Sequence, residues 1–437
     1  MLKKIIHFLL AWAAYWWYGR PARKLIVVGV TGTKGKSTTC RLIASVLEAG
    51  GNKVGLLTTV EFQIAEKRWL NDKKMTMLGR GKIQSMLKQM VKAGCKYAVV
   101  ETSSEGILQY RNIGLNYHTA VFTNLGTEHS ERHGGFENLK KEKGKIFAKA
   151  KVIIANTDDT NSGYYLNFPA KEKWAFNVIP TAVEESLTPD ERDPSATYAR
   201  DDKNSAIKLL SGENIVSDQN GTDFSVGEKK FRLNILGRFN VYNALAAIAV
   251  GRAQKISDDK IAAGLASVKL VEGRMELVNV GQNFKVIVDY AHEPMSLTEL
   301  FKSMREMVGS GKKTIAVVGS DGGGRDIGKR EKMGEVAGMF ADYVIITDVN
   351  CFDEDPQAIA EMLAKGARAA GKKDGEDLFV IVDRRQGITK AISLASAGDA
   401  VAITAKGTEP HIAVAGGKKI PWDDRKVARE VLEALKK

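Results

Sequence analysis

The sequence of 437 residues contains few cysteines and few prolines. Its three cysteines, Cys40, Cys95 and Cys351, are far apart in the chain and form no CxxC pair. This spacing argues against a disulfide framework and against a cysteine-based zinc site, and it favours a cytoplasmic protein. The sequence also shows no internal repeat and no low-complexity tract, which argues against fibrous and solenoid architectures.

The apolar run near the N-terminus is short. Residues 5–18 read IIHFLLAWAAYWWY, and cationic segments flank them on both sides. A spanning helix needs about 20 apolar residues, and no small-residue cleavage site of a signal peptide follows this run. Two interpretations stay open. The run forms a helix that contacts a membrane surface, or it forms a helix that packs on protein.

The composition is that of a globular protein whose partners carry negative charge. Hydrophobic residues make up 44% and charged residues 27%, and the net charge is +13. A chain of this length forms two or three domains. The positive charge favours nucleotides, phosphorylated substrates, nucleic acid or an anionic membrane as partners.

Buried strands alternate with amphipathic helices over most of the chain. KLIVVGVTG, KYAVVE and HTAVFTNL read as strands of one parallel sheet, and a second alternating block begins near residue 284. Residues 176–231 are polar with short alternating stretches, which predicts antiparallel strands. We expect an aromatic N-terminal segment at 1–24, a central α/β domain at 25–280, and a second α/β domain at 281–437.

TGTKGKST at residues 31–38 lies between a predicted strand and a predicted helix. Backbone N–H groups of such a loop surround phosphates at a helix N-terminus, and the motif varies from the strict phosphate-loop pattern because Val30 replaces a glycine. Lys36 can reach the β- and γ-phosphates, and Ser37 can bind Mg²⁺. The residues expected to bind the nucleotide triphosphate, which the resemblance described next implies to be ATP, are Gly32, Thr33, Lys34, Gly35, Lys36, Ser37 and Thr38.

The chain resembles the Mur ligases, ATP-dependent amide-bond-forming enzymes of peptidoglycan synthesis, over residues 25–437. The resemblance rests on an ordered set of motifs: TGTKGKST, VVETSSEG, TNLGTEHSERHGG, EKGKIF, GRFNVYNALAA, EGRMELV, VDYAHEP, GGGRDIGKRE and AKGTE. Within the family it is most similar to the branch that adds the third amino acid of the stem peptide. The fold that the resemblance implies is a central phosphate-loop ATPase domain followed by a Rossmann-like C-terminal domain.

The resemblance implies two Mg²⁺ sites with ATP as co-substrate. Glu101 ends a buried strand at the sheet edge where ligands bind, and a carboxylate there can hold Mg²⁺. The implied metal ligands are Ser37, Glu101, His129 and Lys143. Lys143 would act as a carbamate, since a plain ammonium would repel the metal. The residues expected to take part in catalysis are Lys36, Glu101, His129, Lys143 and Arg274.

The remaining site residues also follow from the resemblance. Asn243 matches a residue that contacts adenine, and Arg274 and Asp289 match residues that contact phosphate and ribose. Closure of the two domains would complete this ATP site. Positions that match substrate-binding residues are Thr76, Ser103, Arg111, Arg325, Asn350 and Glu409.

Two features depart from the family. Phe352 stands where a diaminopimelate-specific ligase has an arginine, so lysine or another amino acid is expected as the acceptor. The uridine-binding domain that usually precedes the phosphate loop is replaced by the aromatic segment. This leaves open whether uridine recognition is reduced, a partner supplies it, or the substrate is a related, lipid-linked muropeptide.

Three functions compete. The first is addition of an amino acid to a UDP-muramoyl-peptide through an acyl phosphate, with no nucleic-acid partner and with a membrane or protein contact through residues 5–18. The second is a ligase similar to folylpolyglutamate synthetase. The third is a membrane-associated nucleotide triphosphatase or nucleic-acid-binding switch, which leaves His129, Lys143 and the second α/β domain without a role.

Overall fold

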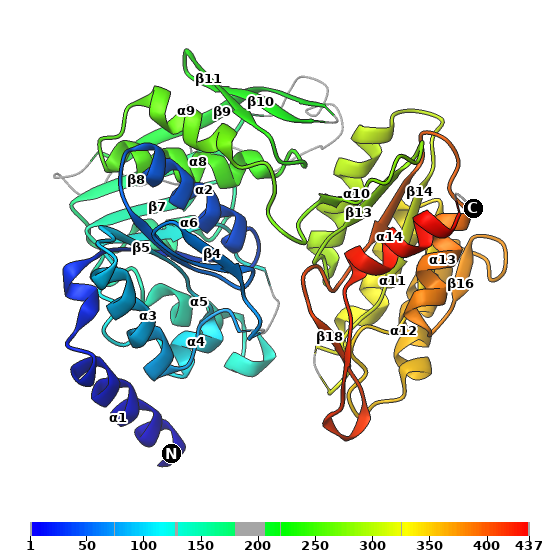
Figure 1. Ribbon diagram of the computed structural model, residues 1–437, viewed down its shortest axis with the longest axis horizontal. Helices are drawn as coiled ribbons and strands as arrows, with labels where there is room; N and C mark the ends of the chain where they lie inside the picture. The colour runs from blue at the N-terminus through cyan, green and yellow to red at the C-terminus, as the bar shows by residue number, and fades with distance from the viewer. Residues whose placement is uncertain are drawn as a thin grey trace. The chain divides into compact units, whose positions relative to one another are not determined.

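The computed structural model describes residues 2–73, 75–126, 130–179, 206–218, 220–324 and 326–435. The chain divides into two compact units (Figure 1). One comprises Met1–Val216 with Asn220–Lys269, and the other comprises Leu270–Lys437 with Ser217–Gln219. The N-terminal segment therefore belongs to the first unit. The first unit ends at Lys269 rather than at residue 280.

The position of this boundary follows from a short strand pair. β12 (Glu276–Leu277) pairs in antiparallel orientation with β13 (Lys285–Val288), so the residues just after 270 join the second sheet.

The first unit is built on an eleven-stranded sheet with the order β11-β10-β9-β8-β7-β6-β1-β5-β2-β3-β4. The strands from β9 to β2 in this order run parallel, and β3 and β4 are added antiparallel at one edge. The strands are β1 (Ile26–Thr31), β2 (Val54–Leu57), β3 (Glu61–Ile64), β4 (Lys67–Leu70), β5 (Tyr97–Glu101), β6 (Thr119–Phe122), β7 (Val152–Asn156), β8 (Glu172–Val178), β9 (Lys208–Asp218), β10 (Gly221–Val226) and β11 (Lys229–Leu233).

The antiparallel prediction for residues 176–231 holds for only part of that range. β10 and β11 are antiparallel, but β9 continues the parallel sheet beside β8. The error arose because alternation of polar and apolar residues reports a half-exposed strand and says nothing about its direction.

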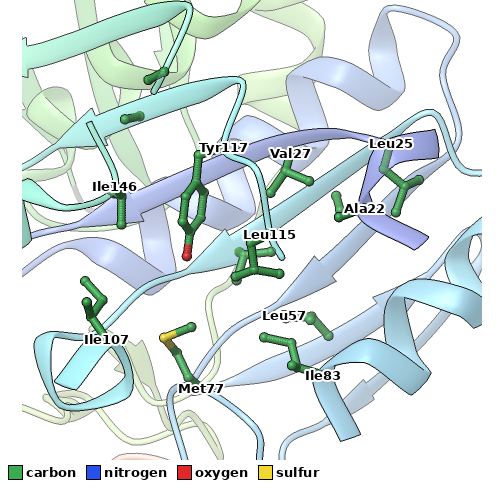
Figure 2. Packing of buried hydrophobic residues seen from close by; sticks show 14 of the residues in the cluster. Ala22, Leu25, Val27, Leu57, Met77, Ile83, Ile107, Leu115, Tyr117 and Ile146 are labelled. Carbon is green, nitrogen blue, oxygen red and sulfur yellow. The ribbon is translucent and has the colours of Figure 1, made fainter. Parts of the chain in front are cut away.

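Helices cover both faces of this sheet (Figure 1). The described helices of this unit are α1 (Leu2–Trp17), η1 (Pro21–Lys24), α2 (Lys36–Ala49), α3 (Arg80–Lys92), α4 (Ser104–Leu108), η2 (Glu131–His133), α5 (Phe136–Gly144), α6 (Ser162–Leu166), α8 (Asn240–Ala253) and α9 (Asp258–Ser267). α2 packs against α8 and α9 on one face. The core of the other face includes Leu25, Val27, Leu57, Ile83 and Tyr117 (Figure 2).

The second unit has a six-stranded sheet with the order β12-β13-β17-β14-β15-β16, parallel except for β12. Its other strands are β14 (Thr314–Val318), β15 (Tyr343–Ile346), β16 (Leu378–Val380), β17 (Ala400–Ile403) and the hairpin β18 (His411–Ala413) with β19 (Lys419–Pro421). Its helices are α10 (Pro294–Val308), α11 (Lys329–Phe340), α12 (Pro356–Ala369), α13 (Arg384–Ser393), η3 (Ala415–Gly417) and α14 (Asp424–Ala434). In the described parts of both units, no helix is long and apolar enough to cross a bilayer.

A buried ion pair joins α13 and α14 in the second unit. Arg384 donates from Nε to Asp424 Oδ1 at 2.8 Å and from Nη2 to Oδ2 at 2.7 Å, and both side chains are fully buried. Arg384 also donates to Thr347 Oγ1 and to the Thr404 carbonyl oxygen, which lie beyond the ends of β15 and β17. Both helices are thereby anchored to the sheet edge by one guanidinium group.

Asp424→Asn should therefore destabilise the second unit. It leaves a buried guanidinium without its counter-charge, which costs about 3–5 kcal/mol in the free energy of unfolding. Urea denaturation followed by circular dichroism measures this change. The control is Glu430→Gln, which breaks the half-exposed Arg385–Glu430 pair, where N and O are 2.7 Å apart. That change should cost about 1 kcal/mol or less. Equal effects of the two substitutions would contradict the role assigned to the buried pair.

Candidate functional site

The polar groups of the first unit meet where three parallel strands end. β1 pairs with β5 and with β6, with Val30 opposite Glu101 and Thr31 opposite Phe122. The loop at residues 32–35 follows β1 directly, and α2 begins at Lys36. The predicted phosphate loop and Glu101 therefore share one edge of the sheet, as expected for an open α/β fold.

The phosphate loop is held by the segment that follows β6. Lys34 N donates to Asn124 Oδ1 at 2.8 Å, and Thr123 Oγ1 donates to the Lys34 carbonyl oxygen at 2.7 Å. Gly126 N donates to Thr33 Oγ1 at 2.8 Å. A Cβ atom on Gly32 would lie 2.0 Å from Thr123 Oγ1, so only glycine permits this close approach.

A chain of hydrogen bonds joins the phosphate loop to a second predicted site residue. Ser37 Oγ donates to Glu101 Oε2 at 2.8 Å, and Thr59 N donates to the same oxygen at 2.8 Å. The Thr59 hydroxyl lies 2.9 Å from Glu101 Oε1 and 2.9 Å from the Thr76 hydroxyl. The structure thus brings together Ser37, Thr76 and Glu101, which lie on separate segments of the chain.

The geometry distinguishes Lys143 from the lysines around it. Lys143 is buried in the last turn of α5, and its Nζ donates to the Gly32 carbonyl oxygen at 2.7 Å. Lys140 and Lys145 instead form ion pairs with Glu137 and Glu142, which lie in α5. Lys36 Nζ donates to the Thr33 carbonyl oxygen at 2.8 Å, so two amines lie against the phosphate-loop backbone.

The donor set suits Mg²⁺ in part. Ser37 and Glu101 offer a hydroxyl and a buried carboxylate, which are the hard oxygen ligands that Mg²⁺ prefers. Lys143 fits only as an anionic carbamate, since an ammonium offers no lone pair. Among the described residues no group of three or more His, Cys, Asp or Glu side chains could hold a metal. His129 lies outside the described residues.

Asn243 lies beneath the phosphate loop. Its Oδ1 accepts from Thr39 Oγ1 at 2.9 Å, and its Nδ2 donates to Asn240 Oδ1 at 2.7 Å. A Cβ atom on Gly35, whose φ is 77°, would lie 2.4 Å from Asn243 Oδ1. The side chain therefore supports the start of α2 from α8. Its contact with adenine stays a prediction.

The predicted substrate residues Ser103 and Arg111 lie around α4. Ser103 caps α4 by accepting from Gly106 N, and Arg111 donates to the Met77 carbonyl oxygen at 2.5 Å. Burial and then the nearby charge of Arg80 lower the pKa of the Arg111 guanidinium. Within the part of the chain that the structure describes, Arg80 Nη2 and Arg111 Nε are buried without a hydrogen-bond acceptor. Two donors of this kind suit an anionic ligand.

In the second unit, Arg274 and Asp289 lie close together. The Arg274 guanidinium lies 4.6 Å from the centroid of the Tyr290 ring. Asp289 accepts from Met275 N at 2.8 Å and from Ala291 N at 2.7 Å. Burial raises the pKa of Asp289, although the charge of Arg274 opposes the shift. Their contacts with phosphate and ribose stay predictions.

The other predicted residues of the second unit form a polar cluster. Asn350 Nδ2 donates to Asp321 Oδ1 at 2.8 Å and to Glu409 Oε2 at 3.1 Å. The fully buried Lys406 donates to Asn350 Oδ1 at 3.2 Å and to Glu409 Oε2 at 3.0 Å. The predicted residue Arg325 lies outside the described residues.

Phe352 lies beside this cluster. Its backbone has φ of 53°, and its N–H donates to the Ala413 carbonyl oxygen at 3.1 Å.

Sequence reasoning missed several residues that hold the predicted ones. They are Thr59, Arg80, Asn124, Asp321 and Lys406. In the structure Thr59 lies two residues after β2 and Asn124 two residues after β6, at the edge where residues that follow parallel strands meet. Asp321 and Lys406 lie within or beside the GGGRDIGKRE and AKGTE motifs. Nothing in the sequence marks Arg80, which becomes notable only through its neighbour Arg111.

Comparison with known proteins agrees with this arrangement. The Mur ligase middle domain matches residues 30–251, and the Mur ligase, glutamate ligase domain matches residues 273–407. A UDP-N-acetylmuramyl-tripeptide synthetase of Roseiflexus sp. is 36% identical, with 96% of this chain and 80% of the relative covered. A UDP-N-acetylmuramoyl-L-alanyl-D-glutamate–2,6-diaminopimelate ligase of Geobacillus kaustophilus is 35% identical, with 95% and 80% covered.

Solved structures show the same fold. A UDP-N-acetylmuramoyl-L-alanyl-D-glutamate–2,6-diaminopimelate ligase superposes with a TM-score of 0.60 at 27% identity, covering 94% of this chain and 79% of the other. A Mycobacterium tuberculosis folylpolyglutamate synthase complexed with ADP gives a TM-score of 0.62 at 16% identity, covering 90% and 91%. The second likeness concerns the fold alone.

The predicted family and fold class are therefore confirmed. Two domain matches in the expected order cover most of the chain, and relatives above 30% identity extend over nearly all of it. The chain belongs to the Mur ligase family, and it is an ATP-dependent ligase that forms amide bonds.

Proposed function

We propose that this chain adds an amino acid to a UDP-muramoyl-peptide through an acyl phosphate. The observation that carries the proposal is the hydrogen-bonded chain Ser37–Glu101–Thr59–Thr76. It connects the phosphate loop, where ATP binds, to a position that matches a peptide-binding residue of the family. The similarity to UDP-N-acetylmuramyl-tripeptide synthetases supports the same substrate class.

The reaction needs an activated carboxylate, because an oxygen of the free carboxylate is a poor leaving group. A carboxylate oxygen of the peptide attacks the γ-phosphorus of ATP, the bond to the β-phosphate oxygen breaks, and ADP leaves. The amine of the amino acid then attacks the acyl carbon, loses a proton and expels phosphate. Lys36 lies at the start of α2, where its charge would offset the negative charge on the transferring phosphoryl group.

Mg²⁺, when bound, would neutralise phosphate charge. Ser37 Oγ and the Glu101 carboxylate would hold it, and we propose that Lys143 contributes as a carbamate. Its neutral amine attacks the carbon of CO₂, an N–C bond forms, and one proton is lost to solvent. This converts the cationic side chain beside Gly32 into an oxygen ligand with negative charge. The matching His129 ligand stays a prediction.

An anionic substrate suits the surroundings of Arg111. Arg80 and Arg111 each keep one buried N–H group without an acceptor in the described chain, and their positive charges disfavour each other. A phosphate or carboxylate of a UDP-muramoyl-peptide would accept from both groups. A neutral substrate would not offset the positive charges of Arg80 and Arg111 in this way.

We also propose that the amino acid binds in the second unit near Asn350 and Glu409, with Arg325 as a further contact. Glu409 would face the amine of the amino acid. Phe352 cannot pair with a distal carboxylate as an arginine would. The named relatives include both tripeptide synthetases and diaminopimelate ligases, so the similarity does not decide which amino acid is added. The proposed specificity therefore rests on Phe352.

The test is a panel of amino acids with ATP and UDP-N-acetylmuramoyl-L-alanyl-D-glutamate, followed by product mass and phosphate release. We expect a product one amino-acid residue heavier, with lysine or another amino acid preferred over meso-diaminopimelate. A preference for meso-diaminopimelate would refute the Phe352 argument and leave the ligase standing. Turnover with a folate and glutamate in place of these substrates would instead favour the folylpolyglutamate alternative.

Lys143→Ala should lower kcat by about 100-fold or more, because the site loses a proposed anionic ligand worth several kcal/mol. Phosphate release under saturating ATP measures the loss. The matched control is Lys141→Ala, which removes an exposed lysine from the same helix and should retain activity. Short-chain carboxylates should partly restore Lys143→Ala and leave the control unchanged. Full activity of Lys143→Ala would contradict the carbamate proposal.

Lys36→Ala should abolish ADP formation in the presence of both substrates. Without the ammonium group, the charge that develops on the phosphates is no longer offset, and a loss of at least about 100-fold is expected. Coupled measurement of ADP provides the readout, with Lys53→Ala as the control for an exposed lysine outside the loop. ADP formation at the normal rate would show that Lys36 does not contact the phosphates.

A further inference from the structure

The N-terminal helix α1 exposes an apolar surface. A narrow stripe faces the first unit, in which Ala11 and Tyr15 are buried. The Phe8 ring contacts the Tyr110 ring edge-to-face at 5.5 Å, and the Tyr15 ring packs against Gly114. α3 lies along the same side (Figure 1). The rest of the circumference is exposed, and its large apolar residues are Ile5, Ile6, Phe8, Leu9, Leu10, Trp12, Trp16 and Trp17.

An exposed apolar surface of this kind is expected to bind a partner. Contiguous exposed apolar side chains of this number are uncommon on monomers and indicate an interaction site. The helix has 16 residues, which at 1.5 Å per residue is about 24 Å. This is shorter than the hydrocarbon core of a bilayer, about 30 Å. The helix can therefore lie at a membrane interface but cannot cross the bilayer.

The segments α1, η1 and α3 contain no Asp or Glu. No Asp or Glu precedes Glu48 in the chain, and α3 contains no carboxylate. The Arg20 guanidinium lies 4.4 Å from the centroid of the Trp16 ring, and Lys88 Nζ lies 5.8 Å from that of Tyr18. The exposed cationic residues of η1 and α3 are Arg23, Lys24, Lys82, Lys88 and Lys92.

We infer that α1 and the adjoining cations of η1 and α3 form a docking surface for an anionic lipid bilayer. Aromatic side chains at the end of the helix suit the headgroup region, and the cations suit anionic lipids. A second copy of the chain fits less well, since dimerisation through this face would bring two sets of cations together. The apolar residues that α1 contributes to this surface are Leu9, Leu10, Trp16 and Trp17, all of them exposed.

Flotation of the full chain with vesicles tests the inference. Vesicles contain phosphatidylcholine with 30% phosphatidylglycerol, or phosphatidylcholine alone. The chain should float with the anionic vesicles, bind the neutral vesicles at least about fivefold more weakly, and dissociate as salt rises. Absence of flotation with anionic vesicles would overturn the inference, whether the chain is then monomeric or self-associated.

Two triple variants test whether binding to vesicles depends on this surface or on exposed apolar side chains in general. Leu9→Gln/Leu10→Gln/Trp17→Gln changes side chains that are 59%, 54% and 84% exposed. The control Leu209→Gln/Val216→Gln/Met339→Gln changes side chains that are 60%, 65% and 64% exposed elsewhere. The first variant should lose binding roughly tenfold or more, and the control should bind like the unmodified chain. Equal binding by both variants would overturn the inference.

A measurement on the unmodified chain avoids reliance on the folding of any variant. Three of the six tryptophans, Trp12, Trp16 and Trp17, lie in α1. Brominated lipids in the anionic vesicles should therefore quench a substantial part of the tryptophan emission. Emission unchanged by brominated lipid would show that α1 does not enter the interface.

Discussion

The register between β1 and its two neighbours determines where the predicted site residues of the first unit lie. With Val30 opposite Glu101 and Thr31 opposite Phe122, the three strands end at one level. The loop that follows β1 then meets the segments that follow β5 and β6. A shift of one residue in the β1–β5 pairing would turn Glu101 to the other face of the sheet. A shift in the β1–β6 pairing would separate Gly32 from Thr123, against which it packs without room for a Cβ atom.

Each buried charged group at this edge of the sheet is hydrogen-bonded to a different element of the fold. The Glu101 carboxylate is buried and accepts hydrogen bonds from Ser37 and Thr59, while the Lys143 amine donates to the loop itself. Each group is held by a partner on another element, so their positions are set before a ligand arrives. Preorganisation of this kind is what phosphoryl transfer requires, because the protein contributes mainly alignment and charge.

Local patterns in the sequence were enough to predict the strand–loop–helix unit and the placement of Glu101 at the sheet edge. The role of Lys143 came only from the family resemblance, since four nearby lysines look alike until burial distinguishes them. Thr59 could not be assigned, because its contact with Glu101 depends on β2 lying beside β5, and strand order is not encoded in spacing. The pairing that joins the residues just after 270 to the second sheet could not be predicted, because β12 has two residues and too short a pattern to recognise.

The packing of α1 has a consequence for biosynthesis. Its partners on the protein, α3 and residues 110–114, follow it by about 60 to 100 residues, which a ribosome adds over several seconds. During that interval the aromatic helix has left the ribosome with no folded surface beneath it. A helix that is apolar on every side is an aggregation hazard at this stage. The anionic bilayer proposed above as its partner would shield the helix at this stage, before the domain has folded.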